Sequence, residues 1–161
     1  MKEKSISKIT IKEICDLSEM SRSTFYLHYQ DQFELLKDIE NEVLTNSFET
    51  LNNLEGSVNT IESIESFLDY VKENKETFGV LLCQAETEDF QISIINNMAA
   101  YVKESIPEVT DNDHANYLFT FIMHGSLNVI RTWIKNEFDV PVKSLAEMIF
   151  KACNNIAGTT E

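Results

Sequence analysis

Apolar residues recur along most of the chain at the three- and four-residue spacing of an amphipathic helix. The spacing predicts a long helix that begins after Asp31 and continues to about Asn53. We expect further helices at about 61–74, 75–83, 89–105 and 111–136, and a last one after Pro141. Because residues 117–123 are apolar on nearly all sides, the helix at about 111–136 is predicted to be central and buried.

Two short helices are predicted in the first thirty residues. Thr10 and Glu13 have the spacing of a capping box, which predicts a helix beginning at Ile11. Residues 18–20 interrupt the apolar pattern, and Ser21 can cap a second helix that runs to about His28. Two short helices on either side of a three-residue turn are typical of a helix-turn-helix motif.

Composition supports an all-α protein. Four Gly and two Pro in 161 residues are too few turn-formers for a many-stranded β fold. The three cysteines lie far apart and fit neither a disulfide framework nor a zinc site, so we interpret Cys15, Cys83 and Cys153 as buried apolar residues. No segment has the length of a membrane span or the pattern of a signal peptide, so we expect a cytoplasmic protein without membrane contact.

Charge is distributed unevenly along the chain. The net charge of −14 argues against a protein that coats nucleic acid with its whole surface. Residues 1–30 carry five cationic and four acidic side chains, a balance of +1, which leaves −15 for the remainder. The N-terminal segment is therefore the part that could approach a polyanion.

The second short helix begins with small polar side chains, Ser21, Ser23 and Thr24, together with Arg22. Short hydrogen-bonding residues at an exposed helix start allow the backbone to approach base edges and phosphates, whereas the alternative is that they are ordinary helix caps. Arg22 could bind guanine or phosphate. Aromatic rings with polar tips follow it at Tyr26, His28 and Tyr29.

The segment ITIKEICDLSEMSRSTFYLHYQDQFELL, residues 9–36, resembles the DNA-binding region of the TetR/AcrR family of transcriptional regulators. The resemblance implies a homodimeric regulator with a helix-turn-helix head at residues 1–45 and an effector-binding and dimerisation bundle at residues 46–161. It also implies a double-stranded DNA operator and an unidentified small-molecule effector. The regulator would be a repressor or an activator, and we favour a repressor. By matched position, the DNA-facing residues would be Thr10, Ser21, Arg22, Ser23, Thr24, Tyr26, His28 and Tyr29.

The chain departs from the family pattern in three places. The segment before Thr10 is too short for the complete first helix that family members have, so we expect this helix to be incomplete. Glu19 stands where the family has Gly, and a non-glycine residue at positive φ would cost about 1 kcal/mol. Gln32 stands where the family has a lysine. The alternative function is therefore a helical dimer that lacks DNA binding and acts by ligand sequestration or protein interaction.

A ligand pocket is the second candidate site. His124, Asn128 and Arg131 share one face of an otherwise apolar helix, where they either line a cavity or make internal hydrogen bonds. Arg131 would suit a negatively charged effector. Aromatic residues either fill the core or line the same cavity. The full candidate set is Phe67, Tyr70, Phe78, Tyr101, Tyr117, Phe121, His124, Asn128 and Arg131.

The last two predicted helices carry a candidate dimer interface. Gly125 and Ser126 lie inside the longer one, where a glycine is unfavourable unless another helix approaches closely. The last helix has a three-four-three spacing of small and apolar residues, at Ala146, Ile149, Cys153 and Ile156. The alternative is a seam within one chain. The family resemblance favours contact with a second copy.

The sequence offers no evidence of catalysis. It contains no motif for a nucleophile, a metal site or a phosphate-binding loop, so we expect a protein that is not an enzyme and that uses no cofactor.

Overall fold

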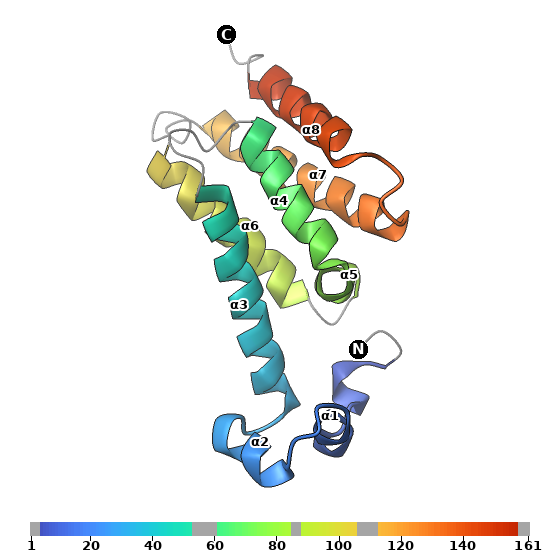
Figure 1. The fold of residues 1–161 in the computed structure, drawn as a ribbon. Helices are drawn as coiled ribbons and strands as arrows, with labels where there is room; N and C mark the ends of the chain where they lie inside the picture. Colours follow the sequence, from blue (N-terminus) through green and yellow to red (C-terminus); the bar gives the residue numbers. More distant parts are fainter. Residues whose placement is uncertain (1–3, 53–60, 85–87, 106–112, 158–161) are drawn as a thin grey trace. The chain divides into compact units, whose positions relative to one another are not determined.

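The computed structural model describes residues 4–52, 61–84, 88–105 and 113–157, and all regular structure in these ranges is helical (Figure 1). The predicted all-α class is therefore confirmed. The chain divides into two compact units, an N-terminal unit of Met1–Asn46 and a C-terminal unit of Ser47–Glu161. None of the described helices is long and apolar enough to cross a membrane.

The N-terminal unit contains three short helical segments and most of a long helix: η1 (Ile6–Lys8), α1 (Ile11–Leu17), α2 (Arg22–His28) and α3 (Gln32–Asn52). Helices α1 and α2 begin directly after their predicted caps, Thr10 and Ser21, and end at Leu17 and His28, as the sequence pattern predicts. Helix α3 begins beside Asp31, whose Oδ1 accepts hydrogen bonds from the backbone N–H groups of Phe33 and Glu34, both at 2.9 Å. In the described residues before Thr10, the chain forms the single 3-10 turn η1.

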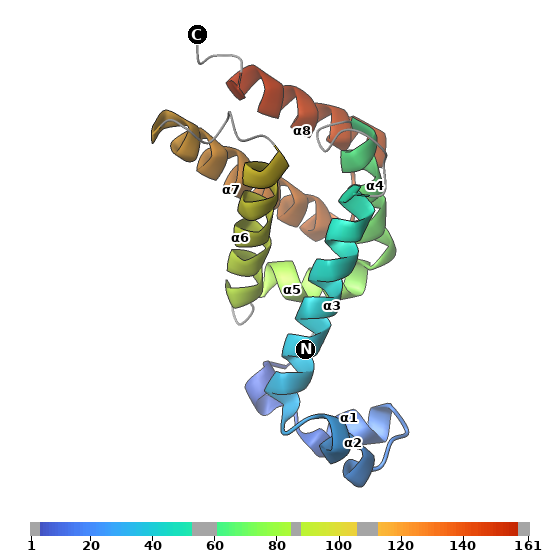
Figure 2. The ribbon, with the colours of Figure 1, turned by 90° about the vertical axis from the view of Figure 1, so that its left-hand side faces the viewer.

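The C-terminal unit contains the end of α3 and, in the described residues, five further helices, with the bounds α4 (Ile61–Glu73), α5 (Lys75–Cys83), α6 (Glu88–Ser105), α7 (Asp113–Lys135) and α8 (Val142–Ala157). Helix α4 packs along α8, and α5 crosses under α6 and α7 (Figures 1 and 2). Apolar side chains from these helices form its core, where Leu68, Val71, Phe78, Phe90 and Ala146 have no exposed surface. Burial of these faces is the main stabilising term.

The corner between α7 and α8 is built around Trp133, which is 2% exposed. Its indole N–H donates to the carbonyl oxygen of Val140 at 2.8 Å, and the ring of Phe138 packs edge-on with centroids 4.7 Å apart. Glu137 and Phe138 both have positive φ, at 55° and 62°. The indole contacts therefore hold a turn whose backbone is costly for residues with a side chain.

Candidate nucleic-acid interface

Helices α1 and α2 pack against each other across a tight turn, the arrangement of a helix-turn-helix motif. The amide of Ser18 closes α1 on the carbonyl of Ile14 at 3.0 Å, and the amide of Met20 reaches back to the carbonyl of Cys15 at 3.0 Å. Between them Glu19 has φ 55°, the left-handed conformation that favours glycine. The turn thus takes a glycine-type backbone without having a glycine.

Replacing Glu19 with glycine is expected to stabilise the N-terminal unit by about 1 kcal/mol, because the steric cost of a Cβ at positive φ disappears. Hydrogen exchange of α1 and α2 amides measures the effect. The control is Glu19→Ala, which removes the charge but keeps the Cβ, and it should give no gain. An equal gain from both substitutions would assign the effect to charge and contradict the steric explanation.

Hydroxyl groups gather at the exposed start of α2. Ser21 Oγ accepts from the backbone N–H of Thr24 at 3.1 Å, which caps the helix. The same oxygen lies 2.8 Å from Ser23 Oγ and 2.7 Å from Thr24 Oγ1. All three side chains are exposed. The cluster therefore serves as a cap and also presents hydroxyl groups that can bond to phosphate or bases.

Helix α2 divides into a buried and an exposed face. Phe25 is 2% exposed and packs against the rings of Tyr26 and Tyr29, with centroids 5.7 and 5.6 Å away. Around this anchor Arg22 is exposed, and Tyr26 and Leu27 are 58% and 80% exposed. A helix that keeps a cation, a phenol and an apolar side chain in solvent can contact phosphate, base edges and thymine methyl groups.

Outside the hydroxyl cluster at the start of α2, Thr10 and Tyr29 are also engaged within the unit. The Thr10 hydroxyl accepts from the Glu13 amide at 3.2 Å, and the Thr10 backbone N–H donates to the Glu13 carboxylate at 2.9 Å, which completes the predicted capping box. The hydroxyl also donates to the same carboxylate at 2.9 Å. The Tyr29 hydroxyl donates to Asp38 at 2.8 Å, and this hydrogen bond raises the pKa of the phenol. To donate its hydroxyl proton to a phosphate, Tyr29 would have to give up the bond to Asp38. His28 is exposed.

Glu13 is the electrostatic centre of the capping box. Its carboxylate forms an ion pair with Lys4 and accepts hydrogen bonds from the backbone and side chain of Thr10. These interactions lower the pKa of Glu13 from 4.5 to about 2, with the hydrogen bond from Lys4 as the largest cause.

Because a depressed pKa favours the folded state only while the carboxyl is ionised, we expect the N-terminal unit to lose stability as the pH falls from 4.5 towards about 2. Glu13→Gln should lower the stability of the N-terminal unit at neutral pH and flatten its dependence on pH in this window. Urea unfolding monitored by hydrogen exchange of the α1 amides measures both effects. Asp16→Asn, at an exposed position of the same helix, is the control. An unchanged acid profile in Glu13→Gln would contradict the assignment.

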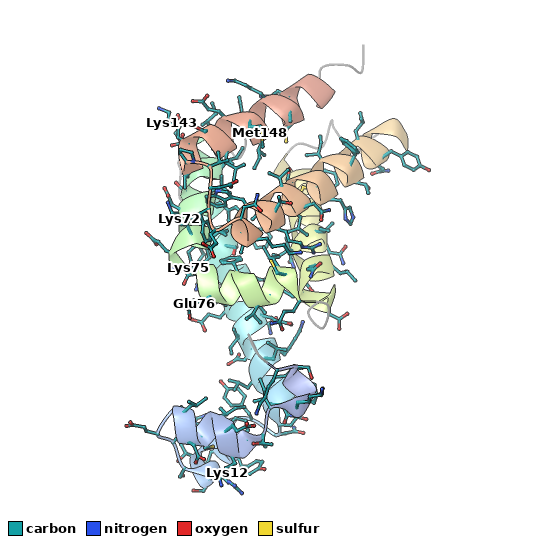
Figure 3. All side chains as sticks on the ribbon, turned by 90° about the vertical axis from the view of Figure 1, so that its right-hand side faces the viewer. Lys12, Lys72, Lys75, Glu76, Lys143 and Met148 are labelled. Atoms are coloured by element: carbon teal, nitrogen blue, oxygen red, sulfur yellow. The ribbon has the colours of Figure 1, made fainter. Side chains whose placement is uncertain are left out.

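Exposed cations in the N-terminal unit extend the candidate surface. Lys8 and Lys12 are exposed, the latter on α1 (Figure 3). The sequence interpretation did not select these two lysines, although the positive balance of the first thirty residues was the available signal. Lysine ammonium groups supply phosphate contacts without reading sequence.

The candidate pocket residues of the C-terminal unit separate into groups. Phe67, Tyr70 and Phe78 form one aromatic cluster, with Phe78 fully buried and edge-on contacts at 6.4 Å to Phe67 and 5.6 Å to Tyr70. On α7, Tyr117 and Phe121 are 79% and 65% exposed. The structure therefore brings the first group together and leaves the second in solvent. The predicted burial of residues 117–123 is thus wrong for Tyr117 and Phe121. The side chain of Tyr101 lies outside the described residues.

The three polar candidates on α7 differ in exposure. His124 and Asn128 are exposed, and Arg131 is partly buried. The Asn128 side chain donates to the carbonyl of His124 at 2.9 Å and accepts from Arg131 Nη1 at 3.2 Å. Arg131 Nη2 also donates to Gln91 on α6. Gln91, which sequence reasoning missed, therefore joins Asn128 and Arg131 in one network.

The candidate dimer residues differ in whether they are buried within the single chain or exposed on its surface. Ala146 and Ile149 are 0% and 8% exposed in the single chain, on the helix that packs along α4. Gly125 is exposed and no atom lies within 4 Å of a Cβ built on it. Ser126 donates a hydrogen bond that opposes the raised pKa of the partly buried Cys153 thiol, the main cause of which is burial. The side chain of Ile156 lies outside the described residues.

Comparisons with known proteins place the C-terminal unit in a family. The model of a family described as "Transcriptional regulator C-terminal region" (TetR_C_8) matches residues 58–155, more than half of the chain. A Bacillus subtilis (strain 168) protein, "Uncharacterized HTH-type transcriptional regulator YxbF", is 18% identical over 161 residues, which cover 94% of this chain and 41% of the relative. The chain thus spans about two-fifths of the length of that curated relative. By its C-terminal region the chain belongs to the TetR family of transcriptional regulators.

Proposed function

We propose that the chain represses transcription by binding an operator in double-stranded DNA through its N-terminal unit. The observation that carries the proposal is the start of α2, where four adjacent polar side chains, residues 21–24, are all exposed on a helix anchored by Phe25. In a helix-turn-helix motif this end of the second helix contacts base edges in the major groove. Lys8 and Lys12 supply phosphate contacts, and the rest of the chain carries the negative charge.

The C-terminal unit binds a small effector and joins two copies of the chain. An effector changes DNA binding only to the extent that it prefers one conformation of the dimer over the other. The residues proposed for the effector are those with buried or partly buried positions, namely Phe67, Tyr70, Phe78 and Arg131. The chain itself performs no catalysis in this scheme.

The proposed dimer face follows α7 and α8. Tyr117 and Phe121 lie one turn apart on α7 and are mostly exposed, and Gly125 continues the same face. On α8, Met148 is 50% exposed (Figure 3). Ala146 and Ile149 are buried inside one chain, where they belong to the side of α8 that packs within the bundle and not to the proposed dimer face. Exposed aromatic side chains on a long helix are suited to packing against a second copy.

The first test is binding of the chain to the genomic DNA upstream of its own reading frame, measured by fluorescence anisotropy at low and high salt. We expect binding that weakens steeply as salt rises, because lysine and arginine contacts displace counterions from phosphates. A chain that forms dimers but binds none of these fragments at low salt would contradict the proposal and favour a helical dimer that acts by sequestration or protein interaction.

Arg22→Ala is expected to weaken operator binding by about tenfold or more if the guanidinium contacts a guanine, with a smaller effect on unrelated DNA. Equal losses on both DNAs would assign Arg22 to a phosphate contact. The control is Lys143→Ala, which removes an exposed cation from α8 in the C-terminal unit (Figure 3). Binding by Arg22→Ala that equals the parent would remove Arg22 from the interface.

A further inference from the structure

Leu27 lies at the centre of the exposed face of α2. Phe25 is the one buried residue of this helix, at 2% exposed, and Leu27 is 80% exposed. Because each residue of an α-helix turns by about 100°, Leu27 lies about 200° from Phe25, nearly opposite the side chain that anchors the helix. The family resemblance does not include Leu27 among the DNA-facing residues.

The surroundings of Leu27 on this face are polar. Ser23 lies one turn earlier on the same side of the helix. The positions on either side of this pair hold further exposed residues with polar groups, Arg22, Thr24, Tyr26 and His28. Helix α2 contains no Asp or Glu, although the whole chain has a net charge of −14. The face around Leu27 therefore suits a polyanion better than the apolar surface of another protein.

The length of α2 allows both of its turns to enter a major groove. The helix has seven residues, Arg22–His28. This corresponds to about 10 Å of helix, and the major groove of B-DNA is about 12 Å wide. When the start of the second helix of a helix-turn-helix motif contacts base edges, the following turn therefore lies in the same groove. Leu27 belongs to that following turn.

A leucine can recognise only one kind of group in this groove. Its side chain has no hydrogen-bond donor or acceptor, so it cannot bind the polar edges of the bases or a phosphate. The C5 methyl of thymine is the apolar group that the four base pairs present there. We infer that Leu27 is a specificity-determining residue that contacts the methyl group of a thymine in the operator. The inference rests on the proposed binding of DNA.

The experiment compares two forms of the genomic DNA upstream of the reading frame. One contains thymidine, and the other is synthesised with deoxyuridine throughout and lacks only the C5 methyl groups. Binding of both to the full chain is measured by fluorescence anisotropy at low salt. We expect the parent to bind the uracil form more weakly by about fourfold or more, the factor for one buried methyl group.

Leu27→Ala is the variant that assigns this loss to one residue. It should bind the thymine form more weakly than the parent does, by a similar factor. It should lose little more on the uracil form, because the contact is already absent and the two changes are not additive. Hydrogen exchange of the α1 and α2 amides should stay at the parent rate, which separates a lost contact from a lost fold.

Two further variants serve as matched comparisons. Leu17→Ala removes the same side chain from α1, where it is 87% exposed, and should lose as much as the parent on the uracil form. Leu27→Met keeps an apolar side chain of similar volume and should retain part of the difference between the two DNAs.

Three results would overturn the inference and leave the proposed function standing. These are equal binding of the two DNAs by the parent, an equal loss on uracil DNA in the parent and Leu27→Ala, and parent affinity of Leu27→Ala for the thymine form. A parent chain that binds neither DNA at low salt would overturn the proposed function, and the inference with it.

Discussion

Replacing Phe25 with alanine is expected to unfold the N-terminal unit and abolish DNA binding. The ring is 2% exposed and supplies much of the core of a unit that has few other buried side chains. Removing a buried phenylalanine costs about 3–5 kcal/mol, which is comparable to the whole stability of a small unit. Hydrogen exchange of the α1 and α2 amides should become rapid throughout.

Leu27→Ala is the matched control for Phe25→Ala, because it removes an apolar side chain from the same helix at a position that is 80% exposed. It should leave the exchange of these amides nearly unchanged. Trp133 is the single tryptophan of the chain and belongs to the C-terminal unit. Thermal unfolding followed by its fluorescence should therefore be the same in both variants and the parent. A lowered midpoint in Phe25→Ala would show that the two units do not unfold independently.

Replacing Phe78 with alanine is expected to destabilise the C-terminal unit by about 3–5 kcal/mol. Phe78 has no exposed surface and is the ring around which Phe67 and Tyr70 pack edge-on. The loss therefore includes the aromatic contacts as well as the buried area. The fluorescence of Trp133 should report a much lower unfolding midpoint, while hydrogen exchange in α1 and α2 stays at its parent rate.

Phe121→Ala provides the comparison, because it makes the same chemical change at a 65% exposed position of α7. At low protein concentration it should hardly alter the midpoint. At higher concentration it should remove whatever stabilisation a second copy provides on this face. A large effect of Phe121→Ala at every concentration would contradict the proposed role of this side chain in dimer contact.

Helix boundaries were the part of the fold that local sequence could predict. Thr10, Ser21 and Asp31 each offer a side-chain oxygen to amides two or three residues ahead, so the information lies within one turn. The positive φ of Glu19 is likewise a local property of the turn. Such features need no knowledge of the tertiary structure, and for this reason the starts of α1 and α2 agree with their caps to the residue.

Contacts between helices were not accessible in the same way. Periodicity places Tyr117, Phe121 and Arg131 on a helix, but it does not determine which neighbouring helix covers each face. The structure exposes the two aromatic side chains and anchors the arginine through Gln91, forty positions earlier in the chain. For the same reason the spacing of Ala146 and Ile149 fits both a partner helix and the α4 seam of one chain. Choosing between such alternatives requires the arrangement of the bundle.

Because Cys15 is buried beside the strained turn, alkylation of its thiol can report when the N-terminal unit opens. Its thiol is 3% exposed, and its carbonyl accepts the hydrogen bond that closes the turn after Glu19. Cys83 and Cys153 are partly exposed, so alkylating reagents should modify them in the folded chain first. Cys15 then reacts only when the N-terminal unit opens. Its alkylation rate therefore measures that opening in the intact protein. In a variant with Cys83 and Cys153 replaced by serine, alkylation would therefore report the opening of the helix-turn-helix alone, without any added label.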